Sequence, residues 1–78
     1  MKAKLKEYFD TDFHYVEVGL KNEPDRAYRR SEIIDNALQR AIGAVDMAQL
    51  CGLDFETGEQ MYEEYKARLE VARNVKMC

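Results

Sequence analysis

Residues 31–51 read SEIIDNALQRAIGAVDMAQLC and carry the clearest structural signal in the chain. Apolar side chains recur there at spacings of three and four residues, namely at Ile33, Ile34, Ala37, Leu38, Ala41, Ile42, Val45, Ala48 and Cys51. Since an α-helix has about 3.6 residues per turn, these positions share one broad side of a single helix. The pattern therefore predicts a helix over 31–51 with a wide apolar face, and Cys51 is expected to lie in the core.

The ends of this helix are marked by local signals. Ser31 is a good N-cap residue, and Glu32 lies in the first turn, where a carboxylate interacts favourably with the helix dipole. A start closer to Pro24 is the competing prediction, because proline suits the first turn of a helix. At the other end, Gly52 predicts a stop, since glycine readily adopts the left-handed backbone found just beyond many helices. Leu53 is expected to supply the apolar contact that accompanies such a stop.

A second helix is predicted at about 55–76. Its start has two candidate caps: Thr57, which forms a capping-box pattern with Gln60, and Asp54, which lies one turn earlier. The expected inner face holds Met61, Tyr62, Tyr65, Leu69 and Ala72, and the expected outer face holds mainly Glu63, Glu64, Lys66, Glu70 and Arg73. Because the link between the two helices is short, residues 31–76 are predicted to form an antiparallel αα-hairpin.

Residues 1–22 are predicted to form a short element packed on this hairpin, as either a helix or a β-hairpin. Residues 3–9 suit both structures, whereas residues 13–20, FHYVEVGL, are rich in β-branched and aromatic residues and alternate as a strand does. We therefore expect extended structure at 13–20, paired with 3–9 or with 26–30. A turn is expected at 23–30, so the chain as a whole is predicted to be mainly α.

Composition and length narrow the class of protein. With 78 residues the chain is long enough for a single small domain, 1–78. It has a net charge of −3 and 35% charged residues, and no apolar run approaches the length of a membrane span. The start lacks the apolar core of a signal peptide, and the two cysteines, Cys51 and Cys78, are expected to be free thiols. These features predict a cytoplasmic protein that does not bind membranes.

A domain this small buries only about 60% of its unfolded surface, so support from a second chain is expected. The apolar face of 31–51 contains a stripe of small residues that lets another helix approach closely, and a mid-helix glycine usually has a packing reason. The candidate helix-packing and self-association residues are Ala37, Ala41, Gly43, Ala44 and Ala48. Two hairpins paired through this stripe would form a homodimeric four-helix bundle.

The sequence offers no reaction centre. A nucleophile–base pair or a zinc site needs several suitable side chains, but the chain has one histidine, His14, and no Cys-x-x-Cys pair. Glu63 and Glu64 are expected to be solvated, and Asp10 and Asp12 are expected to be turn residues. No glycine-rich phosphate-binding pattern is present. We therefore predict no catalytic residues, no metal and no cofactor.

The tyrosines indicate contact with another protein, because tyrosine is enriched at surfaces that are partly apolar and partly wet. The candidate partner surface comprises Tyr62, Tyr65, Glu63 and Glu64. The leading prediction is a non-enzymatic protein–protein interaction or regulatory module that acts through its helical faces.

Two alternative functions depend on charge. Arg26, Arg29 and Arg30, with the lysines at positions 2, 4 and 6, are candidate phosphate contacts for a nucleic-acid-associated accessory protein. The acidic composition of the chain disfavours that function, because nucleic-acid-binding domains are usually basic. The acid-rich stretch 54–70 instead favours an inhibitor of a basic or nucleic-acid-binding protein.

Overall fold

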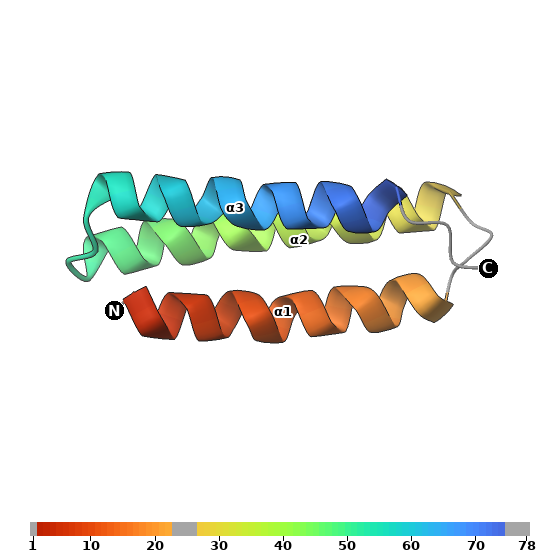
Figure 1. Ribbon diagram of the computed structural model, residues 1–78, viewed down its shortest axis with the longest axis horizontal. Helices are drawn as coiled ribbons and strands as arrows, with labels where there is room; N and C mark the ends of the chain where they lie inside the picture. The colour runs from red at the N-terminus through yellow and green to blue at the C-terminus, as the bar shows by residue number, and fades with distance from the viewer. Residues whose placement is uncertain (1, 23–26, 75–78) are drawn as a thin grey trace.

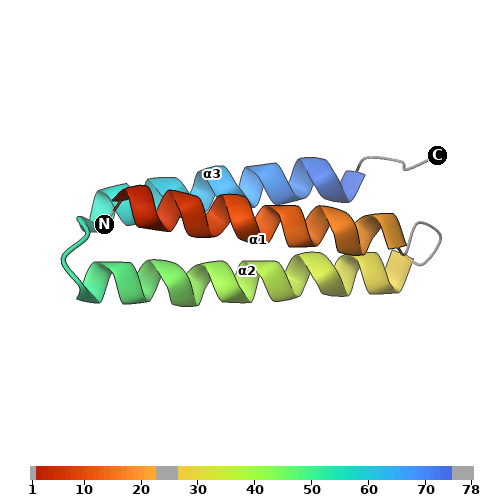
Figure 2. The ribbon, with the colours of Figure 1, turned by 90° about the horizontal axis from the view of Figure 1, so that it is seen from below.

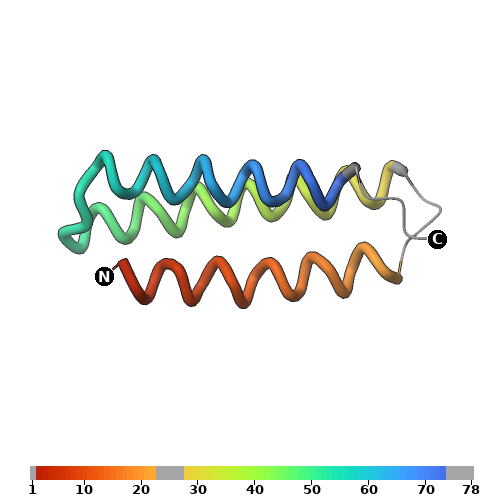
Figure 3. Tube along the Cα trace, viewed as in Figure 1, coloured from red at the N-terminus to blue at the C-terminus, as the bar shows by residue number. Residues whose placement is uncertain are grey.

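Three helices run antiparallel in succession: α1 (Lys2–Asn22), α2 (Ala27–Leu50) and α3 (Phe55–Asn74) (Figure 1). The computed structural model describes residues 2–22 and 27–74, and these contain no β-strand. Figure 2 shows the same helices from below, and the two views together place them at the corners of a triangle. The bundle measures 41 × 16 × 15 Å across its Cα atoms. The tube in Figure 3 shows that α1 begins at the end of the bundle where α2 turns into α3.

The N-terminal element is a long helix, so the expected extended structure at 13–20 is wrong. The buried apolar residues of α1 are Leu5, Phe9, Phe13, Val16 and Leu20, at spacings of three and four. Val18, which a strand would place on the same side as Val16, is 43% exposed. The helical period of the apolar side chains therefore outweighs the β-propensity of the individual residues, because that propensity depends strongly on the packing context. Asp10 and Asp12 lie inside α1 and not in a turn.

The helix predicted over 31–51 begins earlier, at Ala27, and the alternative start closer to Pro24 is confirmed. Ser31 is thus a half-buried residue within α2 and not its N-cap, and residues 27–30 are helical where a turn was predicted. The extra turn brings Arg30 to the C-terminal end of α1, where its Nη1 donates a hydrogen bond of 3.0 Å to the carbonyl oxygen of Leu20. This contact satisfies a helix-terminal carbonyl that has no partner within α1.

The turn between α2 and α3 has the predicted glycine stop. Gly52 has a φ of 110°, its N–H donates to the Gln49 carbonyl at 3.1 Å, and the Leu53 N–H donates to the Ala48 carbonyl at 2.9 Å. These two bonds form a Schellman motif, and Leu53 packs on the core as expected. Cys51, however, is exposed and not a core residue, because Leu53 is the residue that folds back over the interior.

Asp54 is the cap of α3. Its Oδ2 accepts hydrogen bonds from the Thr57 N–H at 3.2 Å and from the Thr57 hydroxyl at 3.4 Å. Thr57 therefore lies in the first turn of α3, and of the two predicted caps Asp54 is confirmed.

The core lies along the axis of the bundle and is centred on α2. The buried apolar residues of α2 and α3 are Ile34, Ala37, Ala41, Val45, Ala48, Met61, Tyr65 and Leu69. The α2–α3 pair confirms the predicted αα-hairpin, and α1 packs along it as the third helix. The contact of α1 with α3 is smaller than the contact of either helix with α2.

Candidate functional site

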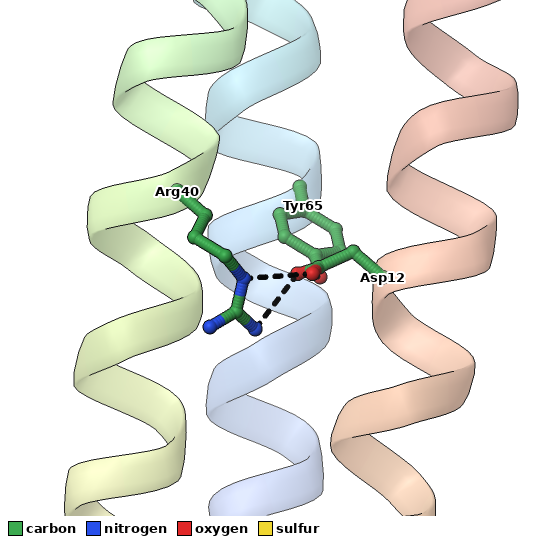
Figure 4. Close-up of polar contacts among 3 residues, drawn as sticks. All are labelled: Asp12, Arg40 and Tyr65. Atoms are coloured by element: carbon green, nitrogen blue, oxygen red, sulfur yellow. Dashed lines mark hydrogen bonds and ion pairs between the residues drawn. The ribbon is translucent and has the colours of Figure 1, made fainter.

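A carboxylate lies in the core where the three helices meet. Asp12, on the buried face of α1, is only 9% exposed. Arg40 of α2 donates from Nε to Oδ1 at 2.8 Å and from Nη2 to Oδ2 at 3.3 Å. The hydroxyl of Tyr65 on α3 donates to Oδ2 at 2.7 Å. Figure 4 shows these side chains, one from each helix, converging on the carboxylate. We call Asp12, Arg40 and Tyr65 the Asp12 cluster.

The pKa values of Tyr65 and Arg40 are both raised in this cluster. Burial raises the pKa of the Tyr65 hydroxyl, and the hydrogen bond to Asp12 raises it further. The hydrogen bond to Asp12 also raises the pKa of Arg40, against the opposing effect of burial. Both shifts move away from neutral pH, whereas a general acid or base works best with a pKa near the working pH. The hydrogen bonds of Asp12, Arg40 and Tyr65 form a polar cross-link between the three helices. Phe9 stacks on Tyr65 at a centroid distance of 4.5 Å.

Tyr65 is expected to make the stability of the fold depend on pH above about pH 10. On unfolding, the phenol returns to a pKa of about 10, so the unfolded chain releases a proton that the folded chain still holds. The free energy of unfolding should therefore fall as the pH rises above about 10. At neutral pH, we expect the free energy of unfolding of Tyr65→Phe to be about 1 kcal/mol below that of the wild type. Between about pH 8 and about pH 11, we expect this free energy to fall less in the variant than in the wild type. Urea denaturation of both chains at each pH measures this, and equal losses would contradict it.

Two further ion pairs join the helices at the surface. Arg68 of α3 bonds Asp10 of α1 at 2.8 Å, and its guanidinium carbon lies 4.0 Å from the ring centroid of Phe13. Arg73 of α3 bonds Asp35 of α2 at 3.1 Å. Because these side chains are substantially exposed, each pair contributes about 0–1 kcal/mol. Arg68 also contributes to the walls of the groove between α1 and α3.

The described part of the bundle has grooves along each of its helix–helix boundaries. The α1/α2 groove, about 330 Å³, is lined by Lys4, Leu5, Tyr8, Ala44, Met47, Ala48 and Cys51. The α1/α3 groove has a part of about 440 Å³ near the C-terminal ends of the two helices, lined by Phe13, Glu17, Leu20, Lys21, Arg68, Val71 and Ala72. Its other part, about 380 Å³, is lined by Lys2, Lys6, Phe9, Asp10, Met61, Glu64, Tyr65 and Arg68. The α2/α3 groove, about 260 Å³, is lined by Ile42, Val45, Asp46, Gln49, Phe55, Glu59, Tyr62 and Glu63.

The predicted partner surface is divided between different parts of the molecule. Tyr62, which is half-buried, and the exposed Glu63 lie together in the α2/α3 groove. Glu64 faces the α1/α3 groove instead. Tyr65 is 3% exposed and belongs to the Asp12 cluster. Tyr62 and Glu63 thus line the α2/α3 groove, and Glu64 and Tyr65 line the α1/α3 groove.

The small-residue stripe of α2 packs within the chain. Ala37 and Ala41 are 0% exposed and Ala48 is 6% exposed, all within the core that the three helices share, and Ala44 is half-buried. Ala37 and Ala41 are therefore covered within the chain, whereas Ala44 and Ala48 line the α1/α2 groove. Gly43 lies on the exposed side of α2, and a Cβ atom added there would have nothing within 4 Å.

The predicted basic residues do not form one surface. Arg29 pairs with Glu32 at 3.2 Å, and Arg30 bonds the Leu20 carbonyl, whereas Arg26 lies outside the described residues. The lysines at positions 2, 4 and 6 belong to the first turns of α1, at the opposite end of the bundle from the start of α2 (Figure 3). At about 1.5 Å per residue, the length of α1 separates the two groups by about 25 Å.

The sequence interpretation missed the pairing of Asp12 with Arg40, which joins two helices. The available signal was the position of Asp12 at helical spacing from Phe9 and Val16, because an acid inside an apolar stripe needs a buried partner. Reading residues 10–12 as a turn concealed that signal.

The structure also bears on the histidine, metal sites, membrane spans and terminal cysteine considered in the sequence. His14 is exposed on α1, with its ring 6.2 Å from that of Tyr15. No group of three or more metal-binding side chains occurs within 2–22 and 27–74. None of the three helices, over the same residues, combines the length and hydropathy needed to cross a bilayer. Cys78 lies outside the described part of the chain.

Comparison of the chain with protein-family models, with curated proteins and with solved structures found no match.

Proposed function

We propose that this chain is a non-enzymatic protein-binding module that acts through its exposed helical side chains. The supporting observation is the set of large apolar side chains at the α2–α3 turn. Met47, 63% exposed, lines the α1/α2 groove, and Phe55, 63% exposed, lines the α2/α3 groove. Leu50, at the end of α2, is 84% exposed. Methionine and aromatic residues are enriched in protein interfaces, and exposed apolar groups that gather in one region of a surface often mark such sites.

The polar side chains of the interior are already bonded to one another, and this supports the same proposal. Asp12, Arg40 and Tyr65 bond one another across three helices, and their pKa shifts keep the arginine charged and the tyrosine neutral. These side chains are occupied in holding the bundle together. The side chains left for other molecules are those on the outside.

Self-association remains a prediction, and the part of the alanine stripe that could take part in it is Ala44 and Ala48, which line the α1/α2 groove. Light scattering across a dilution series would show whether two copies associate.

Site-specific photo-crosslinking tests the proposed function. A photoreactive phenylalanine is placed at position 55, and at position 15 as the matched control, because both native residues are exposed aromatics. In cells that naturally produce the chain, we expect a discrete adduct from position 55 but not from position 15. Unlabelled wild-type chain should compete for this adduct, and the Phe55→Ser variant should not. No adduct from position 55, or the same adducts from both positions, would contradict the proposal.

A second candidate is an inhibitor of a basic or nucleic-acid-binding protein. The observation that favours it is the acidic lining of the α2/α3 groove by Asp46, Glu59 and Glu63. A basic partner seated there would lose access to its own acidic or nucleic-acid ligand.

A further inference from the structure

We infer that the α2/α3 groove binds a basic amphipathic helix of another protein. This inference rests on the proposed function, and it adds which groove is used and what kind of partner it takes. The argument uses the shape of the groove, the side chains left exposed in it, and its charge.

The shape of the α2/α3 groove suits a helix. The residues that line it recur at helical spacing on both sides, namely Ile42, Val45, Asp46 and Gln49 on α2 and Phe55, Glu59, Tyr62 and Glu63 on α3. None of these residues belongs to α1, so the groove lies on a side of the hairpin that α1 leaves open. At about 1.5 Å per residue its length is about 12 Å, which corresponds to two turns of a bound helix. Packing of side-chain ridges into such a groove is how helices associate in bundles.

Apolar side chains in the groove are incompletely covered. Val45 is 6% exposed and belongs to the core, so it forms the bottom of the groove. Phe55 is 63% exposed and Ile42 is 41% exposed, and Tyr62 beside them is half-buried. An apolar stripe on an incoming helix would bury the rings of Phe55 and Tyr62 together with Ile42, as in helix-in-groove recognition.

The charge of the groove determines the chemistry of that helix. Asp46, Glu59 and Glu63 line it, and no lysine or arginine from the described part of the chain does. Among residues 2–22 and 27–74, none of these carboxylates takes part in an ion pair or a side-chain hydrogen bond. The α1/α3 groove differs, because Lys2, Lys6, Lys21 and Arg68 also line it.

Carboxylates on both walls favour a partner with lysine or arginine on both flanks of its apolar stripe. Opposite charges placed this way attract the partner at long range and set its orientation. The same carboxylates repel the phosphates of nucleic acid. An added β-strand has no place to pair, since the described residues offer no sheet edge.

Three synthetic peptides of one length test the inference. The first carries leucines at helical spacing flanked by lysines. The second has glutamates in place of the lysines, and the third has the composition of the first in scrambled order. Each is titrated into the full ¹⁵N-labelled chain and followed by amide chemical shifts. We expect the first peptide alone to bind, with the largest shifts in residues 42–49 and 55–63 and with affinity that falls as salt rises.

Two matched triple variants separate the groove from the overall charge of the chain. Asp46→Asn/Glu59→Gln/Glu63→Gln removes the carboxylates of the groove. Glu7→Gln/Glu17→Gln/Glu64→Gln removes the same number of exposed, unpaired carboxylates from α1 and from the α1/α3 side of α3. We expect the first triple to weaken binding of the basic peptide at least about tenfold and the second less than about threefold.

Several results would overturn the inference. Equal weakening by the two triples, or shifts centred on α1, would show attraction to net charge and not to the groove. Equal binding of the glutamate-flanked peptide would overturn the charge argument, and concentration-dependent shifts of the groove without peptide would identify a second copy as its occupant. If no peptide binds but position 55 still crosslinks a partner, the inference fails and the proposed function stands. If position 55 also gives no adduct, both fail.

Discussion

The Arg40→Met variant is expected to be about 2–3 kcal/mol less stable than the wild-type chain. The substitution keeps most of the length of the side chain but removes the cation that bonds both oxygens of Asp12. The carboxylate, 9% exposed, would then have the hydroxyl of Tyr65 as its remaining partner. The Arg40 side chain is 44% exposed, so water reaching the site keeps the loss below the 3–5 kcal/mol typical of a fully buried pair. Urea denaturation followed by circular dichroism at neutral pH measures the difference.

Two controls show whether that loss of stability comes from leaving the Asp12 carboxylate without its arginine partner. Asp12→Leu/Arg40→Met/Tyr65→Phe removes the whole cluster, and we expect it to return to within about 1 kcal/mol of the wild type, since apolar replacements often match a buried polar network. Arg29→Met breaks the exposed pair with Glu32 and should cost less than about 1 kcal/mol. If Arg40→Met is no worse than Arg29→Met, the Asp12 cluster does not stabilise the bundle.

Replacing Leu69 with alanine is expected to lower the free energy of unfolding by about 3–4 kcal/mol. Leu69 is 0% exposed and belongs to the core. Its truncation loses burial energy and leaves a cavity that surrounding side chains fill only in part. A chain of 78 residues has a total stability of about 4–12 kcal/mol at typical values per residue, so the loss is a large share of it. The thermal midpoint, measured by circular dichroism, should fall by about 15 °C.

Val71→Ala is the matched control on the same helix. Val71 is 66% exposed, so its truncation should change the free energy of unfolding by less than about 0.5 kcal/mol. Similar losses for Leu69→Ala and Val71→Ala would mean that the interior of the bundle is not packed as described.

The α2–α3 hairpin could be predicted from sequence because its signals are local. Apolar side chains at helical spacing, the glycine at 52 and the short link before Asp54 each act within a few residues. The conformation of α1 could not be settled in the same way. Its aromatic and β-branched residues favour a strand taken alone, and the helix is stabilised by packing Phe9, Phe13 and Val16 against the hairpin.

The candidate groove was predictable on one wall only. Tyr62 and Glu63 belong to the partner surface chosen from sequence, because they lie near the edge between the inner and outer faces of α3. Ile42 was assigned to the apolar face of its helix, and its exposure depends on which side of α2 is covered by α1. That choice involves contacts between residues far apart in the chain, as does the bond of Asp12 to Tyr65 across a separation of 53 residues. Patterns within one helix do not record such contacts.

The central position of α2 has a consequence for how the chain folds. Each of the two large helix–helix interfaces joins helices that are neighbours in sequence, and the smaller one joins α1 to α3. A topology dominated by contacts between neighbouring segments has low contact order, and such chains fold fast, in microseconds to milliseconds. The bonds from α3 to Asp10 and Asp12 close the longest loops, with separations of 58 and 53 residues. Because loop-closure entropy opposes these bonds most, they are the ones expected to form after both helical pairs have docked.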